Sequence, residues 1–249
     1  KYPLKPWVSI SGEVRLKGCF EVRPCVAKQQ IGTKKNPAPS CKAILDNDRS
    51  ARSGVYYIKT KPTVTKAYCY MENVPGCGGG GWTTIMKTNG YMQTFRYDSI
   101  FWKNKDSHND IGGQSGTDIQ ETKLPTYWTL PFTKLCLGMK TKAAQQQPKW
   151  VHLNYQANSL YSVIADGNYR GFSIGRDKWK SLLPGSYLQP HCNREGFNSL
   201  KRVRIGIEAN NENNCGSPDS HLGFGLKCHE TTGNCGQKKI KAHGYILAQ

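Results

Sequence analysis

Short stretches in which apolar and polar residues alternate, separated by glycine, proline and asparagine, dominate the chain from Cys41 onward. Alternation with a period of two is typical of β-strands that bury one face. A strand is therefore expected to follow the Ser53-Gly54 turn. Further strands are expected at 82–87, 135–140, 150–155, 162–165, 169–174, 203–207 and 244–247. Asp166-Gly167 separates two of these segments and predicts a hairpin, because both residue types tolerate the positive φ of a tight turn.

Helical signals are few and short. A helix is expected just after Cys41, a second within 93–103, and a third at 177–183 that Pro184-Gly185 ends. The segment 210–239 is rich in glycine, asparagine and serine, so it is expected to form a long loop.

By composition the chain divides into two parts. Residues 1–40 are rich in proline, lysine and glycine and are expected to form a basic N-terminal arm or small extension. Residues 41–249 are expected to form one α+β domain with short antiparallel strands, few short helices and long loops held by disulfides.

Ten cysteines, an even number, are spread along the chain, and the Cys-x2-Cys pairs of a zinc ribbon are missing. Such spacing predicts five disulfides and an oxidising compartment. Connectivity does not follow from sequence, although Cys19/Cys25 and Cys69/Cys77 are each spaced to close a local loop. The expected disulfide cysteines are Cys19, Cys25, Cys41, Cys69, Cys77, Cys136, Cys192, Cys215, Cys228 and Cys235. No run of about 18 apolar residues is present, and the chain begins at Lys1 without a leader, so a secreted, mature extracellular protein without a membrane span is expected.

The charge of the chain is strongly positive. It carries 35 lysines and arginines against 17 aspartates and glutamates, a net charge of +18. A field of this size attracts polyanions such as sulfated glycans, acidic mucus, nucleic acid or anionic lipid surfaces. Nucleic acid is the weakest candidate because a secreted, disulfide-rich protein seldom meets it, so glycans, including sulfated or acidic ones, are the expected partners. The candidate polyanion-binding groups are Lys59, Lys61 and Lys66; Arg202 and Arg204; and Lys238, Lys239 and Lys241. If they do not converge, the same charge only keeps the protein soluble.

One segment, 69–87, combines two cysteines, four consecutive glycines and a strand that opens at Trp82. It resembles the opening of fibrinogen-related domains and of the intelectins, which are secreted recognition modules. The resemblance implies a fibrinogen C-terminal-like fold. Other segments similar to that family are 40–58, 101–103, 112–113 and 121–124. The segments 121–128, 222–225 and 244–249 also resemble secreted cnidarian fibrinogen-related proteins, including a kind found in coral skeletal matrix.

The C-terminal half departs from the fibrinogen pattern, because the Asp-x-Asp calcium loop and the Gly-Trp-Trp signature are missing. Instead, 210–225 resembles the calcium and sugar segment of intelectins, in which an Asn-Thr-Glu-His-His-Cys string precedes a glycine-rich turn. Alignment at Cys215 implies ligand positions at Asn210, Glu212 and Asn213, with Asn213 in place of a histidine.

Side-chain oxygens are dense between Glu208 and Asp219, and calcium prefers six to eight oxygen ligands. A weak calcium site is expected, with a Kd of about 10⁻⁴–10⁻³ M, the range of extracellular modules. The expected calcium ligands are Glu208, Asn210, Glu212, Asn213 and Asp219. Residues expected to bind the sugar or to form a wall beside it are Asn214, His221, Phe224, His229 and Tyr245. The alternative is an asparagine-rich surface loop whose side chains only cap turns.

Other motifs carry less chemistry. The alternating groups of 106–110 (Asp-Ser-His-Asn-Asp) suit a cation, although a solvated loop is the simpler explanation. Residues 171–175 satisfy the Gly-x-Ser-x-Gly pattern of hydrolases, with Asp219 and His243 following. That pattern needs a strand–turn–helix, whereas these residues follow a predicted hairpin. The four-glycine run lacks the Gly-Lys-Ser/Thr ending of a P-loop. Because neither of these two motifs has the features that catalysis requires, no enzyme is expected. Tryptophans such as Trp150 are assigned mainly to the core.

Together these patterns predict a secreted, lectin-like carbohydrate-binding protein. The loops of 208–230 are expected to capture a sugar with the help of calcium, while the basic groups attract an anionic matrix. The alternative is a structural protein of extracellular matrix, mucus or a mineralised skeleton that binds anionic polysaccharide; a venom or defence component is a third hypothesis. A homo-oligomer is expected, because avidity multiplies weak sites.

Overall fold

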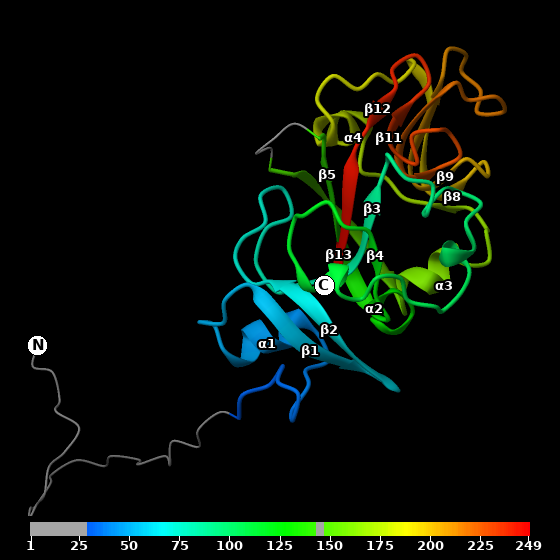
Figure 1. Cartoon of the computed structure of the whole chain (residues 1–249). Helices are drawn as coiled ribbons and strands as arrows, with labels where there is room; N and C mark the ends of the chain where they lie inside the picture. Colours follow the sequence, from blue (N-terminus) through cyan, green and yellow to red (C-terminus); the bar gives the residue numbers. More distant parts are fainter. Residues whose placement is uncertain (1–28, 143–146) are drawn as a thin grey trace, which may run out of the picture.

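The computed structural model describes residues 29–142 and 147–249, which form two antiparallel β-sheets joined by short helices (Figure 1). The strands are β1 (Gly54–Thr60), β2 (Thr63–Tyr70), β3 (Trp82–Asn89), β4 (Thr122–Lys123), β5 (Phe132–Lys140), β6 (Lys149–Ala157), β7 (Arg170–Gly171), β8 (His191–Ser199), β9 (Val203–Asn210), β10 (Ser220–Leu226), β11 (Thr232–Cys235), β12 (Ile240–Lys241) and β13 (His243–Ala248). The α-helices are α1 (Cys41–Asn47), α2 (Thr126–Thr129), α3 (Leu160–Ile164) and α4 (Arg176–Leu182), and the 3-10 turns are η1 (Ile100–Trp102) and η2 (Gly112–Gln114). The expected α+β class is thus mostly β-sheet in the described residues.

The first sheet contains seven strands in the order β1-β2-β3-β13-β5-β6, with β4 paired to β3. Strand β13, drawn in red at the centre of Figure 1, is the last strand in sequence yet lies between β3 and β5. Tyr245 of β13 pairs with Lys87 on one side and with Gly138 on the other. The sheet therefore joins segments from both ends of the domain.

The second sheet contains six strands in the order β12-β11-β10-β9-β8-β7. Four glycines, Gly196, Gly206, Gly223 and Gly233, lie in register across β8 to β11. A Cβ at Gly206 would lie 2.4 Å from the Leu222 oxygen, so larger residues do not fit where these strands approach each other.

A single large core lies between the two sheets and is closed by the helices. The first sheet contributes residues such as Leu137 and Ile246, and the second contributes Ile207 and Phe224. Trp179 of α4 is fully buried in the same cluster. A smaller cluster lies under α1 and β1, and Ala38 joins it by pairing with Ile58 of β1. The C-terminal part of the expected arm, around Ala38, therefore packs on the domain.

Most of the expected strands with clear alternation are confirmed, as are the helix after Cys41 and the helix near 177–183. Residues 162–165 are not a strand, because Ser159 caps α3 with reciprocal Ser159–Ser162 hydrogen bonds. Asp166-Gly167 therefore follows a helix and is not a hairpin turn. The expected strand at 169–174 shortens to β7, and the expected helix at 93–103 reduces to η1. The expected loop 210–239 was wrong in large part, since β10 and β11 form within it.

Four disulfides lie within the described residues: Cys41–Cys69, Cys77–Cys136, Cys192–Cys215 and Cys228–Cys235. The expected local loop closed by Cys69 and Cys77 was wrong, because Cys69 of β2 bonds to Cys41, whereas Cys77, in the segment after β2, bonds to Cys136. Cys19 and Cys25 lie outside the described residues. Disulfides of this number are typical of oxidising compartments. In the described segments, no helix combines the length and the apolar character needed to cross a bilayer.

Candidate functional site

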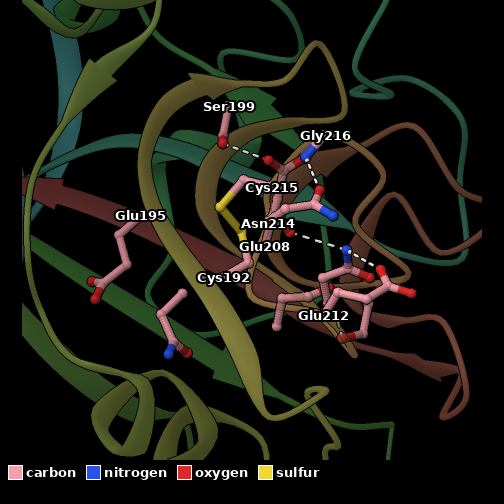
Figure 2. Close-up of a disulfide and its surroundings, with 12 residues drawn as sticks. Cys192, Glu195, Ser199, Glu208, Glu212, Asn214, Cys215 and Gly216 are labelled. Carbon is pink, nitrogen blue, oxygen red and sulfur yellow. Dashed lines mark hydrogen bonds between the residues drawn. A yellow bond between two sulfur atoms is a disulfide. The ribbon is translucent and has the colours of Figure 1, made fainter.

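Within the expected calcium and sugar segment 210–225, residues 210–219 form the loop that links β9 to β10, and the rest lies in β10. The Cys192–Cys215 disulfide attaches it to the start of β8 (Figure 2). Asn210 holds the loop from its base, because its Nδ2 donates to Glu212 Oε2 and to the Asn214 carbonyl, both at 3.0 Å. The loop therefore has a defined shape, fixed by a disulfide and by one buried amide.

Two of the expected calcium ligands are not available at the surface. Glu208 and Asn210 are fully buried. Ser199 Oγ donates to Glu208 Oε2 at 2.5 Å, and His221 Nδ1 lies 3.6 Å from Glu208 Oε1. In Figure 2, a dashed line joins Ser199 to Glu208, whereas Glu195 lies apart from this pair. The Glu208 carboxylate therefore belongs to the interior of the second sheet.

The other three expected ligands, Glu212, Asn213 and Asp219, are exposed on the loop. Within the described residues, one group of three His, Cys, Asp or Glu side chains has its ligand atoms within 4.8 Å of one another. This group includes none of the five expected calcium ligands. That group is His221, Cys228 and Cys235. Because the two cysteines form a disulfide, they offer no thiolate to a metal. The carboxylates of the expected calcium set are thus not gathered in a single shell.

The expected sugar wall is partly wrong. Asn214 and His229 are exposed, but His221 is 4% exposed and Phe224 and Tyr245 are fully buried. Phe224 faces the main core, and the Tyr245 hydroxyl donates to the backbone of 117–118. These three rings are covered by protein, so no sugar can stack on them.

Burial perturbs the titration of Glu208 and His221. Desolvation raises the pKa of Glu208 to about 7, although the Ser199 hydrogen bond and the nearby Arg202 and Arg194 oppose the shift. Desolvation, with the positive charge of Arg202, lowers the pKa of His221 to about 4. Both groups are therefore uncharged near pH 6, which suits an interior position better than a calcium site.

Two further sequence motifs do not form sites. His108 is half-buried against the rings of Phe95 and Phe101, and burial lowers its pKa, while Asp106 accepts a bond from Asn104 at 2.6 Å. His243, the expected last member of a hydrolase order, is buried in β13 and stacks on Tyr91. Asp219 remains on the exposed loop, so no triad is assembled.

The basic groups do not converge. Arg204 is 1% exposed and donates to the Tyr97 carbonyl and to Asn198 Oδ1, so its assignment to polyanion binding was wrong. Arg202 is exposed in the β8–β9 turn. The group Lys238, Lys239 and Lys241 lies at β12, at the opposite end of the molecule from the β1–β2 hairpin (Figure 1). Each group therefore acts separately.

The β1–β2 hairpin presents the best-formed basic surface. Tyr57 pairs with Lys66, and Lys59 pairs with Val64 on the same face, so polar and apolar side chains alternate across the two strands. Lys66 Nζ lies 5.5 Å from the centre of the Tyr57 ring. We call this the hairpin face; it consists of Val55, Tyr57, Lys59, Val64, Lys66 and Tyr68. No ion pair involves Lys59, Lys61 or Lys66 within the described residues.

A surface around Trp150 was missed at the sequence level, where this residue was assigned to the core. Trp150 is half-buried and lines three adjoining hollows. The available signal was the period-two spacing of Trp150 and His152, which places both on the face of β6 opposite to Val151, a core residue.

No protein-family model matches the chain. No curated protein matches it in sequence either. Among solved structures, the chain is similar to the fibrinogen-like globe domain of human ANGPTL2, with 15% identity and a TM-score of 0.37 over 86% of this chain and 99% of that one. The fibrinogen-related family therefore stays a resemblance, and the function is argued from the residues of this chain.

Proposed function

We propose that this chain is a non-catalytic recognition protein of the extracellular space that binds anionic polysaccharide through the hairpin face. The observation that carries the proposal is the set of exposed lysines without acidic partners, Lys59, Lys61 and Lys66, on and beside a face that also carries Tyr57 and Tyr68.

The chemistry of the hairpin face suits a sulfated or carboxylated sugar chain. Exposed lysines attract anionic groups over a Debye length of about 8 Å at physiological salt. Tyrosine rings offer apolar faces beside them, which suit the C–H faces of sugar rings. Lys34 and Lys35 are exposed on the turn whose Gly32 carbonyl accepts the Tyr57 amide, so they add positive charge at the edge of the same hairpin.

The proposal predicts a salt-sensitive interaction that depends on this hairpin. Binding of a heparin-type sulfated glycan to the whole chain is measured by calorimetry at several salt concentrations. In the test variant Lys59, Lys61 and Lys66 become glutamine; in the matched control Lys238, Lys239 and Lys241 become glutamine. Loss of three exposed ion pairs of about 0.5 kcal/mol each weakens binding by roughly tenfold.

The expected outcome is a tenfold loss for the hairpin variant and a much smaller loss for the control. Equal losses in both variants would mean that net charge alone governs binding, and the hairpin face would have no special role. Absence of binding by the unmodified chain to any sulfated or carboxylated glycan would refute the proposal.

A calcium-assisted sugar site at the loop 210–219 is the second candidate. It is supported by the exposed oxygens of Glu212, Asn213 and Asp219 on a loop that the Cys192–Cys215 disulfide fixes. Binding of neutral sugars that a chelator abolishes, and that Glu212→Gln with Asp219→Asn removes, would establish it. Sugar binding that is indifferent to chelator and to both substitutions would exclude it.

A further inference from the structure

Three adjoining hollows surround Trp150 on the first sheet. Their volumes are about 470, 300 and 220 Å³. The loop containing Pro75 and Gly76 runs beside all three, and Ser181 of α4 borders the two larger hollows. The smallest hollow opens toward Tyr68, which also belongs to the hairpin face. The hollows therefore continue the hairpin face across the sheet.

The position of Trp150 is fixed by the residue opposite it in the sheet. Its ring lies over Gly138 of β5, where an added Cβ would lie 2.4 Å from two ring carbons. Tyr70 and Tyr245 contact the same ring at centroid distances of 6.0 and 5.7 Å. The absence of a side chain at Gly138 thus lets the indole lie on the sheet.

Trp150 differs from the tryptophans of the core. Trp102 and Trp179 are fully buried, and their indole N–H groups donate to the backbone of 95–96 and to Glu195. Trp150 keeps part of its surface exposed, and its indole N–H makes no hydrogen bond within the described residues. An accessible indole with a free donor is typical of aromatic groups that contact a ligand.

Two residues that line the hollows carry buried polar atoms without a partner. Tyr70 Oη and His152 Nε2 are buried and have no hydrogen-bond partner within the described residues. One lines the smallest hollow and the other lines the hollow of about 300 Å³. Burial, with the positive charges of Lys134 and Lys178, lowers the pKa of His152, so its ring is neutral at physiological pH and retains an acceptor nitrogen. A small rotation of either side chain would bring its atom to the hollow, where a ligand hydroxyl could pair with it.

The charge around the hollows has one sign. The described residues that line them include two exposed lysines, Lys149 and Lys178, and no aspartate or glutamate. An aromatic plate, hydroxyl-binding atoms and lysines at the margin form a set that fits a sugar chain with anionic substituents better than it fits an apolar peptide.

We infer that the hollows around Trp150 bind individual sugar rings of the anionic polysaccharide, with one ring stacked on the indole, its hydroxyls bonded to Tyr70 and His152, and its anionic groups paired with Lys149 and Lys178. This inference rests on the proposed function and adds a site of sugar recognition to the charge-driven contact at the hairpin face. The hairpin face gathers the chain electrostatically, and the Trp150 hollows select ring shape.

The test measures binding of a heparin-derived hexasaccharide to the whole chain, by calorimetry and by tryptophan fluorescence. Trp150→Ala lowers the affinity by roughly tenfold, the loss typical of an aromatic anchor, and Trp150→Phe removes the ligand-induced change in emission. Because Trp150→Ala also removes packing on Tyr245, Lys178→Gln provides a second variant with an exposed side chain. Its matched control is Lys180→Gln, the same charge change two residues further along α4, outside the hollows.

The expected result is weaker binding for Lys178→Gln, about threefold, and unchanged binding for Lys180→Gln. Equal effects of the two lysine variants, together with full affinity in Trp150→Ala and an emission response that persists in Trp150→Phe, would overturn the inference. If the hairpin variant alone loses affinity, the proposed function stands and the Trp150 site falls. If the Trp150 and Lys178 variants lose affinity while the hairpin variant does not, the hairpin proposal falls and the hollows carry the binding.

Discussion

The buried pair Glu208 and His221 predicts an unusual pH dependence of stability. The folded carboxyl keeps a proton up to a pKa of about 7, whereas its ordinary pKa is 4.5, so the unfolded chain releases that proton first. On its own, Glu208 therefore makes the free energy of unfolding fall as pH rises from 4.5 to 7. His221 has the opposite sign: its folded pKa of about 4 lies below the ordinary 6.5, so on its own it makes stability rise with pH from 4 to 6.5.

The two slopes cancel where their windows overlap. One pKa unit is worth about 1.4 kcal/mol, so over the two units from pH 4.5 to 6.5 each residue alone changes the free energy of unfolding by about 3 kcal/mol. In the unmodified protein the folded pair holds one proton and the unfolded pair also holds one. The net contribution of the pair is therefore flat across that range.

Substitution of one partner exposes the slope of the other. Urea unfolding is followed at pH 4.5, 5.5 and 6.5, with the disulfides intact, for the unmodified chain, Glu208→Gln, His221→Gln and the double variant. Relative to the unmodified chain, His221→Gln loses about 3 kcal/mol as pH rises, Glu208→Gln gains about 3 kcal/mol, and the double variant is flat. If both single variants follow the pH profile of the unmodified chain, the buried, uncharged pair is refuted.

Three further predictions concern the fold and the sites. Glu195→Ala leaves the amides of Ile174 and Gly175 and the indole N–H of Trp179 without their acceptor. We expect the free energy of unfolding by denaturant to fall by about 3–5 kcal/mol, and by less for Glu195→Gln. Equal losses for the two variants would contradict the role of the Glu195 oxygens as acceptors. The double substitution Cys192→Ser with Cys215→Ser removes a disulfide between cysteines 23 residues apart, and it lowers the free energy of unfolding by about 3 kcal/mol. A thermal scan that matches the unmodified chain would show that Asn210 alone holds the loop. Gly138→Ala displaces the Trp150 ring and lowers hexasaccharide affinity as Trp150→Ala does, at a cost in stability of about 1–3 kcal/mol; unchanged affinity would show that the position of the indole does not matter.

Several strands of the first sheet were predictable from their pattern, although β2 and β4 were not among those expected. Residues 82–87 and 135–140 have the apolar content of a buried sheet, and both segments form central strands. The strands β10 and β11 were missed because their glycines, such as Gly223 and Gly233, interrupt the alternation and look like loop residues. Only the neighbouring strands explain why glycine is required there.

The candidate site shows the same limit. Residue types between Glu208 and Asp219 predicted a calcium site, but neither they nor the pattern around Phe224 could indicate that Glu208 and Phe224 turn inward. The position of the Trp150 ring depends on Gly138, which is twelve residues away in sequence and directly opposite in the sheet. Disulfide partners are likewise set by the packing of segments distant in sequence, so Cys69 pairs with Cys41 of α1 and not with the nearest cysteine, Cys77.

The central place of β13 imposes an order on assembly. Strands β3 and β5 each have an edge that only β13 covers, and β13 is synthesised after both. At about 5–20 residues per second, the chain from Ala157 to His243 takes roughly 4 to 17 s to appear, and during that time both edges are open to other chains. Both cysteines of the Cys77–Cys136 disulfide precede β13 in the chain, so this bond, which joins the segment before β3 to β5, can form before the closing strand is made. A chaperone that covers either edge during this interval would therefore protect the chain from aggregation.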